Sequence, residues 1–260
     1  PFKDCSALKT VRFASNSLLE VISKESFSQT ALASIFIPTA VKLIGQNAFY
    51  NCGGLIAVSF SSDSLLETID IQAFQNTRLI AVTVPHTVKA IGTNAFYNCL
   101  SLSTVSFDSN SILETIGSQA FMQAAVIDIT IPVSVKAIGV DAFKSCTSLT
   151  SLAVSCASTM AIDSTAFTSS SITSLSLPST VIYTGPVIRK TIASCSLCGI
   201  GKYSATGDDG SGACSSCNAG SSTGNSYGTE GSDQSVCSAC AAGTYSTRSE
   251  ERRVGKECRS

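Results

Sequence analysis

Charged residues are scarce in this chain of 260 residues: Asp, Glu, Lys and Arg make up 13% of it, and the formal net charge is −1. No basic run occurs before the last dozen residues. This argues against nucleic acid as a partner, because clustered Lys and Arg are the footprint of such proteins. No apolar run approaches the roughly 18 residues that a membrane-spanning helix needs. We therefore expect a membrane association only through an anchor outside these residues.

Histidine is nearly absent as well. The single histidine, His86, directly follows Pro85 in a predicted turn, and a lone His in a turn is far more often solvated than a general base. No nucleophile elbow, metal-binding spacing or phosphate-binding loop accompanies it. Three glutamates occupy one repeat position and are interpreted as solvated loop residues: Glu20, Glu67 and Glu114. The sequence therefore predicts no enzyme, no cofactor and no metal.

What the sequence has in abundance is a repeat. Phenylalanine recurs at steps of 22 or 25 residues, with a last step of 24, and most copies read Ile-x-x-x-Ala-Phe, as in Ile91 to Phe96. The seven copies are Phe27, Phe49, Phe74, Phe96, Phe121, Phe143 and Phe167. A fixed period of about 20 to 50 residues indicates stacked units that bury their apolar faces only against each other. The predicted fold class is a repeat solenoid.

Each unit also carries a stretch of the form Leu-x-x-Val-x-apolar, whose alternating apolar sites predict a half-buried strand. The eight predicted strands are residues 8–13, 32–37, 55–60, 79–84, 102–107, 126–131, 149–154 and 172–177. Proline follows every second strand and should end its hydrogen bonding. A Ser-rich segment follows the others, so the full period is 47 residues. Strands laid side by side, one per coil, give a parallel sheet with neighbours about 4.8 Å apart.

Four cysteines recur at intervals of 47 residues: Cys5, Cys52, Cys99 and Cys146. Two coils would separate successive members, so their Cα atoms should lie about 10 Å apart, beyond the limit of about 7 Å for a disulfide. We interpret them as buried free thiols that fill space as small apolar side chains. A redox or metal role would require ligating partners, and none recurs with them.

The combined pattern Ile-Gly-x-x-Ala-Phe-x-x-Cys-x-x-Leu-x-x-Val-x-Phe resembles the BspA-type leucine-rich repeat, as does Ile-Pro-x-x-Val-x-x-Ile-Gly after alternate strands. The resemblance covers residues 1–183. It departs from the pattern at Asp70 and Asp163, where Gly is usual, and at Ser26, where Ala is usual. It implies a leucine-rich repeat with a parallel sheet on one face. It also implies an extracellular or surface-exposed binding scaffold, of the kind found in bacteria and microbial eukaryotes.

Solenoids bind partners on their sheet face, through strand residues that point away from the core. Aligning the strands makes this face nearly uncharged and rich in hydroxyls, with an apolar stripe at Ile56, Ile80 and Ile127. Ser and Thr suit any solvated strand, but contiguous exposed apolar surface tends to mark an interaction site. The predicted contact residues are Ile56, Ile80, Thr83, Ser106, Ile127, Asp128 and Thr130. Ice-binding proteins also present hydroxyl arrays, although these rows are irregular because they mix in Phe, Arg, Ala and Ile.

From Cys195 the composition changes to Gly, Ser and paired cysteines, spaced Cys-x2-Cys-x15-Cys-x2-Cys-x19-Cys-x2-Cys. Such pairs fit a zinc ribbon or disulfides; three pairs, Gly/Ser/Thr loops and a surface-type scaffold favour disulfides. The segment resembles the ephrin-receptor-like cysteine-rich repeat. The disulfide candidates are Cys195, Cys198, Cys214, Cys217, Cys237, Cys240 and Cys156. The connectivity stays open; one hypothesis is Cys198–Cys214, Cys217–Cys237 and Cys156–Cys195.

The predicted organisation is a solenoid over residues 1–183, a linker over 184–194, a small disulfide-rich module over 195–247 and a tail over 248–260. The tail carries eight charges and resembles the translation of a sequencing adapter rather than native protein. We expect a non-enzymatic extracellular or cell-surface protein whose sheet binds a protein or glycan, with the cysteine-rich module as a stalk. A self-associating matrix protein is the main alternative, and an ice-binding protein is a more distant one.

Overall fold

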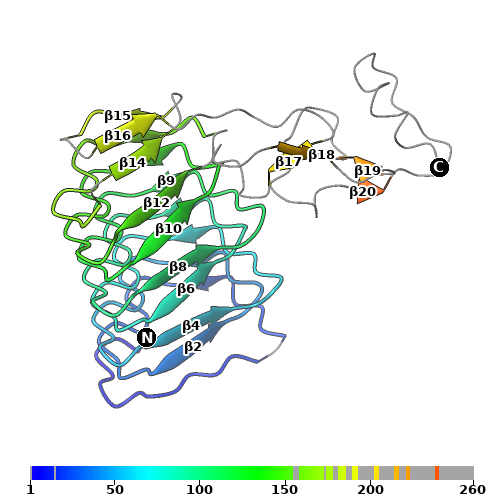
Figure 1. Ribbon diagram of the computed structural model, residues 1–260. Helices are drawn as coiled ribbons and strands as arrows, with labels where there is room; N and C mark the ends of the chain where they lie inside the picture. The colour runs from blue at the N-terminus through cyan, green and yellow to red at the C-terminus, as the bar shows by residue number, and fades with distance from the viewer. Residues whose placement is uncertain are drawn as a thin grey trace. The chain divides into compact units, whose positions relative to one another are not determined.

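The computed structural model describes residues 2–14, 16–154, 158–172, 174–177 and 181–185, and beyond these only the backbone of five short strands. The chain divides into two compact units. The first comprises residues 1–154, 158–175 and 180–191; the second comprises 155–157, 176–179 and 192–260. The first unit is a stack of coils in which one parallel strand after another is added along a single axis (Figure 1).

Six strands form one face of the first unit in the order of the sequence, and each is parallel to its neighbours. They are β2 (Ser34–Ile37), β4 (Ala57–Phe60), β6 (Ala81–Val84), β8 (Thr104–Phe107), β10 (Asp128–Ile131) and β12 (Ser151–Val154). Strand β14 (Ser174–Leu177) pairs instead with β16 (Arg189–Ile192). These six strands and β14 each begin two residues after the start of the corresponding predicted stretch. The predicted parallel-sheet solenoid is therefore confirmed.

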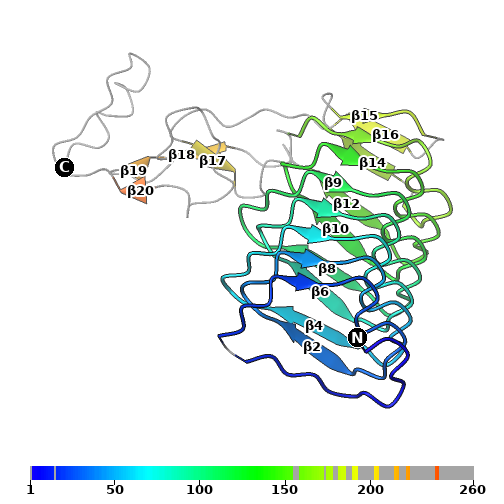
Figure 2. The same cartoon turned by 180° about the vertical axis from the view of Figure 1, so that it is seen from behind.

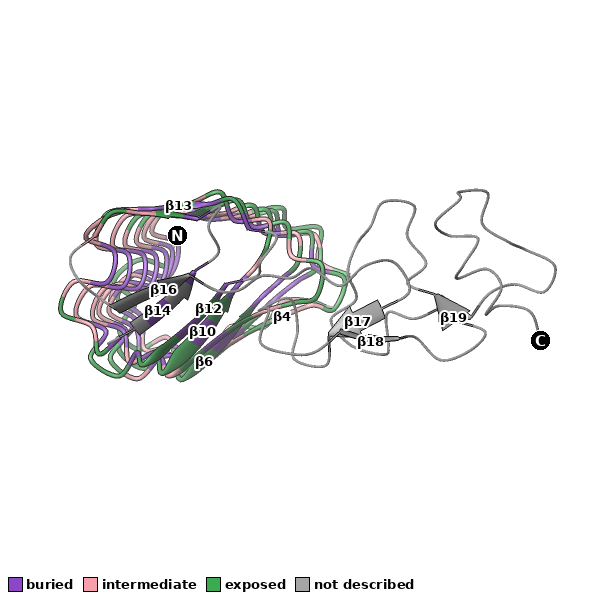
Figure 3. Cartoon of the chain, turned by 45° about the horizontal axis from the view of Figure 1, so that its top comes forward, coloured by how far each residue is buried: buried purple, intermediate pink, exposed green. Residues whose placement is uncertain are grey.

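Side chains of these strands alternate between the interior of the coils and solvent. In β6, Val82 and Val84 are buried, whereas Ala81 and Thr83 are exposed. The same alternation holds in β2, β10 and β12, as the period of two in a strand requires. Figure 3 shows the buried residues along the inside of the coils and exposed ones along the outside.

The coils contain a second parallel sheet that the sequence analysis did not predict. It consists of eight strands of two residues each: β1 (Val21–Ile22), β3 (Leu43–Ile44), β5 (Thr68–Ile69), β7 (Ala90–Ile91), β9 (Thr115–Ile116), β11 (Ala137–Ile138), β13 (Ala161–Ile162) and β15 (Ile182–Tyr183). Seven of these strands, β1 to β13, end on an isoleucine that is buried, such as Ile44 and Ile69. These isoleucines are the ones that precede the repeat Phe in the sequence pattern. The pattern was interpreted as a buried packing position and not as part of a strand.

The repeat phenylalanines form a continuous stack through the interior, as predicted. From Phe27 to Phe167, successive rings lie 5.1–5.7 Å apart between centroids and within 15° of parallel. The backbones of successive coils are hydrogen-bonded at the same point. From Phe27 to Phe143, each Phe N–H donates to the Ala carbonyl of the next coil; Phe49 to Ala73 and Phe96 to Ala120 are both 2.8 Å. Figure 2 shows these coils from behind, with the N-terminal ones at one end and β15 at the other.

The turns around each Phe require left-handed backbone. From Phe27 to Phe143, the residues two before and two after each Phe have positive φ, for example Asn47 at 57° and Asn51 at 56°. Asn tolerates this region better than most residues. The Asn side chains also bond from coil to coil: Asn76 Nδ2 donates to Asn51 Oδ1 at 2.6 Å, and Asn98 Nδ2 donates to Asn76 Oδ1 at 2.8 Å. This amide ladder runs parallel to the Phe stack.

Two expectations fail in the first coil. Residues 8–13 do not form the predicted strand, and Cys5 is exposed rather than buried. Both have the same physical reason: in this structure the coil at the start of the given sequence packs only against the coil that follows it, so it has fewer backbone partners and less apolar cover than an interior coil. Phe2 shows the same effect, since its ring stacks on Phe27 but is 44% exposed.

The second unit contains two antiparallel pairs of short strands. Strand β17 (Lys202–Ser204) pairs with β18 (Cys214–Ser216), and β19 (Ser221–Ser222) pairs with β20 (Ser238–Ala239). Six of the disulfide candidates lie on residues whose placement is not described: Cys156, Cys195, Cys198, Cys217, Cys237 and Cys240. For Cys214 only the backbone is described, and residues 248–260 lie outside the described part altogether. Over the residues that the structure describes, no helix has the length and apolar character to cross a membrane.

Candidate ligand-binding face

The three predicted apolar contact residues lie on the exposed face, each one residue before a strand of the six-stranded sheet. Ile56, Ile80 and Ile127 are 47%, 54% and 50% exposed. Ile56 and Ile80 are on adjacent coils, because the Ile80 N–H donates to the Ile56 carbonyl at 3.2 Å. Ser103 stands between Ile80 and Ile127, with backbone bonds to both. The stripe is therefore an adjacent apolar pair, Ile56 and Ile80, and a third Ile that is separated from the pair by the coil of Ser103.

The predicted polar contact residues lie further along the strands of the same face. Thr83 on β6 and Ser106 on β8 are exposed register partners, and their hydroxyl oxygens lie 2.9 Å apart. Asp128 and Thr130 are exposed on β10, where Asp128 is in register with Thr104 of β8. The four residues thus span three neighbouring strands.

Pairing along this sheet alternates between full and partial. The proline after every second strand predicted an end to hydrogen bonding there, but not the loss of pairing over most of the junction. Strands β2 and β4, β6 and β8, and β10 and β12 are each in register over four residues. By contrast, β4 and β6 share only the pair Ala57–Ala81, and β8 and β10 share only the pair Thr104–Asp128. At every second junction between neighbouring strands, the two strands are therefore paired only at their first residue. We call such a junction open, and a junction paired over four residues closed.

Proline explains which junctions open. The closed pairs are completed by a backbone N–H just past the strand: Ser61 donates to Ile37 O at 3.2 Å, and Asp108 donates to Val84 O at 3.1 Å. At the same repeat position after β6 and β10 stand Pro85 and Pro132. Proline has no N–H to donate. The bonds that would close β6 onto β4 and β10 onto β8 therefore cannot form.

A hollow lies at each open junction. The β4–β6 hollow, of about 370 Å³, is lined by residues that include Ser59, Phe60, Thr83 and Pro85. The β8–β10 hollow, of about 500 Å³, is lined by residues that include the equivalents 47 positions later: Ser106, Phe107, Thr130 and Pro132. Four of the seven predicted contact residues, Thr83, Ser106, Asp128 and Thr130, line a hollow. The three Ile residues do not.

The hollows differ in charge. Asp108 lines both of them, and Asp128 adds a second carboxylate to the β8–β10 hollow. The positions equivalent to these two in the β4–β6 hollow are Ser61 and Ala81. No Lys or Arg is among the described residues that line either hollow. The face therefore has two similar depressions, of which one is more acidic.

Three lysines of the coils form ion pairs beside the second sheet. Lys42, Lys89 and Lys136 each directly precede a strand of that sheet and pair with the glutamate of the preceding coil. The three ion pairs are Lys42–Glu20 at 3.2 Å, Lys89–Glu67 at 2.8 Å and Lys136–Glu114 at 2.9 Å. The glutamates are exposed or half-exposed, as solvated loop residues should be, but the sequence analysis missed their partners. Exposed pairs of this kind contribute little to stability, because solvent screens the two charges.

The recurring thiols are integrated into the interior of the coils. Cys52, Cys99 and Cys146 are fully buried, and each Sγ donates to the carbonyl of a Phe one coil earlier, at 2.9, 3.2 and 3.0 Å. Burial raises the pKa of Cys99 to about 11 and that of Cys146 to about 12. A threonine hydroxyl, Thr77, lies 3.3 Å from Cys99 and partly offsets the rise in its pKa. In the described part of the chain no three residues are placed to hold a metal ion.

These raised pKa values predict an order of thiol reactivity. The thiolate is the nucleophile, so a thiol with a raised pKa stays neutral until the pH approaches that pKa. With iodoacetamide at pH 8, we expect Cys5 to be alkylated on the order of 100-fold faster than Cys99 or Cys146. Peptide mass mapping over time measures this, and the difference should vanish in urea. Equal rates in the folded protein would contradict the burial.

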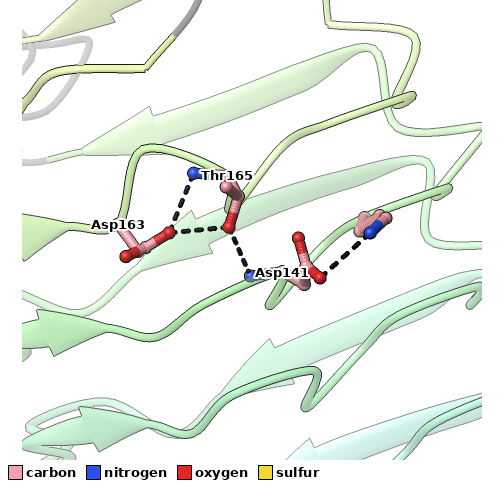
Figure 4. Close-up of polar contacts among 4 residues, drawn as sticks. Asp141, Asp163 and Thr165 are labelled. Atoms are coloured by element: carbon pink, nitrogen blue, oxygen red, sulfur yellow. Dashed lines mark hydrogen bonds and ion pairs between the residues drawn. The ribbon is translucent and has the colours of Figure 1, made fainter.

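A polar cluster near the C-terminal end of the coils has a structural role (Figure 4). Asp163 accepts hydrogen bonds from the Thr165 N–H at 2.8 Å and the Thr165 hydroxyl at 2.7 Å, and these lower the pKa of Asp163. The Thr165 hydroxyl oxygen accepts in turn from the Asp141 N–H of the previous coil at 3.0 Å, while Lys144 pairs with Asp141. Asp70, the other departure from the Gly pattern, similarly accepts from the Ile71 N–H at 2.7 Å. Both aspartates cap their own turns.

The chain is similar to several solved structures, two of which are more than 25% identical to it in sequence. The pneumococcal vaccine antigen PcpA is 32% identical, with a TM-score of 0.42, over 46% of this chain and 29% of that chain. The T. pallidum leucine-rich repeat protein is 27% identical, with a TM-score of 0.46, over 51% and 62%. A leucine-rich cell surface protein from Faecalibacterium prausnitzii is 20% identical, with a TM-score of 0.38, over 71% and 75%. The chain thus spans less than two thirds of the first two proteins.

Among curated proteins, none matches this chain. The family described as BspA type leucine rich repeat region matches residues 1–103 and 67–195. Together these two ranges cover about three quarters of the sequence and include the stacked phenylalanines, both parallel sheets and both hollows. The chain therefore belongs to the BspA-type leucine-rich repeat family.

Proposed function

We propose that this chain is part of an extracellular or cell-surface protein that binds a protein or glycan, without catalysis, through the exposed face of its six-stranded sheet. The observation that carries the proposal is the apolar stripe of Ile56, Ile80 and Ile127, each about half exposed, beside the two hollows. Ile56 and Ile80 are adjacent, and adjacent exposed apolar side chains tend to mark an interaction site. Membership of a family that contains surface proteins supports the same role.

A stacked scaffold suits recognition because it holds its contact residues still. The Phe stack and the coil-to-coil backbone bonds fix the strands beneath the stripe. A surface that is already ordered loses less conformational entropy when a partner binds. The relatives described as a vaccine antigen and as a cell surface protein support a location outside the cell.

We further propose that residues 195–247 form a disulfide-bonded, ephrin-receptor-like stalk for this scaffold. The support is the spacing of the three Cys-x2-Cys pairs and the Gly- and Ser-rich segments between them. Disulfides form and persist in oxidising, extracellular surroundings, so the stalk and the proposed location are consistent with each other.

The test is a binding screen of the whole chain against immobilised extracellular-matrix proteins and glycans. For any ligand found, replacing Ile56, Ile80 and Ile127 together by Asp should weaken binding at least about 10-fold, because it places charge in the apolar contact. A control triple variant, Leu65→Asp, Leu100→Asp and Val140→Asp, changes apolar residues elsewhere that are similarly or more exposed and should bind normally. Equal binding by both variants would overturn the proposal. Self-association without any ligand, seen by sedimentation, would favour the matrix-protein alternative.

A further inference from the structure

The two hollows are copies of one site. Seven residues that line the β4–β6 hollow have their counterparts, 47 positions later, in the lining of the β8–β10 hollow; among these pairs are Val58 and Val105, and Phe60 and Phe107. Forty-seven residues correspond to two coils, so the copies lie on one face, two strand spacings apart, which is about 10 Å. The interior stack advances by a similar amount, since Phe74 to Phe96 and Phe96 to Phe121 measure 5.3 and 5.2 Å.

Each copy combines the same three kinds of contact. The phenylalanine, Phe60 or Phe107, supplies partly exposed apolar surface. The proline lines the hollow as well; Pro132 is partly exposed, whereas Pro85 is buried. Ser and Thr hydroxyls from the two strands supply hydrogen-bond donors. The carbonyl that ends the earlier strand lacks its usual partner in the next strand, because that partner is a proline. Each hollow therefore provides a ligand with an apolar contact, hydroxyl donors and a backbone carbonyl acceptor.

We propose that the two hollows together bind one peptide in the polyproline II conformation, with proline or another apolar residue of that peptide seated in each hollow. This inference rests on the proposed function and names the class of partner. A polyproline II helix has three residues per turn and rises about 3.1 Å per residue, so residues i and i+3 lie on one side about 9.3 Å apart. This matches the spacing of about 10 Å between the hollows. In a β-strand, residues i and i+3 point to opposite sides.

The chemistry of the hollows supports the same partner. A polyproline II backbone is fully solvated and has free carbonyls. The Thr130 hydroxyl can donate to these carbonyls, and so can one of the paired Thr83 and Ser106 hydroxyls, namely the one that accepts in the bond between them. Such peptides dock in grooves with aromatic walls, and Phe60 and Phe107 provide these walls.

The two copies differ in a way that sets the charge of the peptide. The carboxylates of Asp108 and Asp128 both line the β8–β10 hollow, with no described basic residue lining either site. None of the ion pairs among the described residues involves these two carboxylates. A Lys or Arg beside the residue in the β8–β10 hollow would complement them. The expected ligand is therefore a proline-rich peptide with basic residues.

The direct test is fluorescence anisotropy with the whole chain and a labelled peptide of four Pro-Pro-Arg units. The comparison peptide has the same composition in an order that breaks the three-residue period. We expect the periodic peptide to bind at least about 10-fold more tightly. Replacing Asp108 and Asp128 by Asn should weaken its binding by about 10-fold and reduce its dependence on salt. Equal binding of the two peptides would overturn the proposal.

A second pair of variants tests the geometry of the hollows. Pro85→Ala with Pro132→Ala restores the two missing N–H donors, so the junctions can close and peptide binding should be lost. Pro38→Ala is the matched control: it makes the same change after β2, where the preceding stretch, residues 8–13, forms no strand. This control should bind the peptide as the native chain does, and circular dichroism should show all variants folded. If the proline double variant binds normally, the proposal is wrong.

The outcome also separates this inference from the broader proposed function. A glycan or matrix protein whose binding depends on Ile56, Ile80 and Ile127, but is unaffected by Pro85→Ala and Pro132→Ala, would support recognition by the sheet face and overturn the peptide site. Loss of peptide binding in the proline variant, with the Ile variant unaffected, would support the hollows and overturn the apolar stripe.

Discussion

Replacing Phe96 by Ala is expected to lower the free energy of unfolding by about 3–5 kcal/mol. The Phe96 ring is fully buried and stacks between Phe74 at 5.3 Å and Phe121 at 5.2 Å. Its removal leaves a cavity that its neighbours cannot fill, because their own positions are fixed by bonds such as Phe74 N to Ala95 O at 2.8 Å. Urea denaturation followed by circular dichroism measures the effect.

Phe2→Ala is the matched control for this experiment. Phe2 belongs to the same column but stacks only on Phe27 and is 44% exposed. We expect a loss of no more than about 1 kcal/mol, because less apolar surface is returned to water. Coils interact mainly with their nearest neighbours, so Phe96→Ala should also weaken protection from hydrogen exchange most strongly in the adjacent coils. Similar losses for Phe2 and Phe96 would contradict the stacked interior.

Replacing Gly117 by Ala is expected to cost about 3 kcal/mol. A Cβ at this position would lie 2.7 Å from the Gly92 carbonyl carbon and 2.8 Å from the Thr93 nitrogen. Both atoms are backbone of the neighbouring coil, so relief requires a coil to move rather than a side chain to rotate. The Gly117 N–H also donates to Ile91 O at 2.8 Å, and such a movement would lengthen that bond. Thermal and urea denaturation provide the measurement.

Gly53→Ala is the corresponding control. No atom lies within 4 Å of a Cβ built at Gly53, so the change should alter the free energy of unfolding by no more than about 0.5 kcal/mol. If Gly117→Ala were as mild as Gly53→Ala, the coils could not be packed as closely as the structure has them at the Ile-Gly step.

The candidate site shows which features of the binding face could be predicted from the sequence. Aligning the repeats was sufficient to select exposed residues on one face, and the structure places all seven predicted contact residues on that face. Alignment alone did not separate them into an apolar stripe and two hollows. That division depends on where adjacent strands lose contact, which is a property of two coils together.

The sequence by itself determined which residues occupy equivalent positions in successive coils and so form one column along the solenoid. The spacing of Phe, of Leu-x-x-Val and of Cys defines the coil, and because coils stack in register, equivalent positions such as Phe74 and Phe96 must meet. The sequence also placed proline after alternate strands. These features are local and repeated, so they could be recognised without coordinates.

Only the tertiary structure decided what each column does. It revealed a second sheet of strands too short to show a pattern of their own, an exposed Cys5 in a coil with one neighbour, and ion pairs such as Lys89–Glu67 between coils. It also showed that Pro85 and Pro132 open the sheet toward the preceding strand and leave hollows there. The physical reason is that a hydrogen bond, a cavity or an ion pair belongs to two neighbouring coils, whereas a repeat describes one coil at a time.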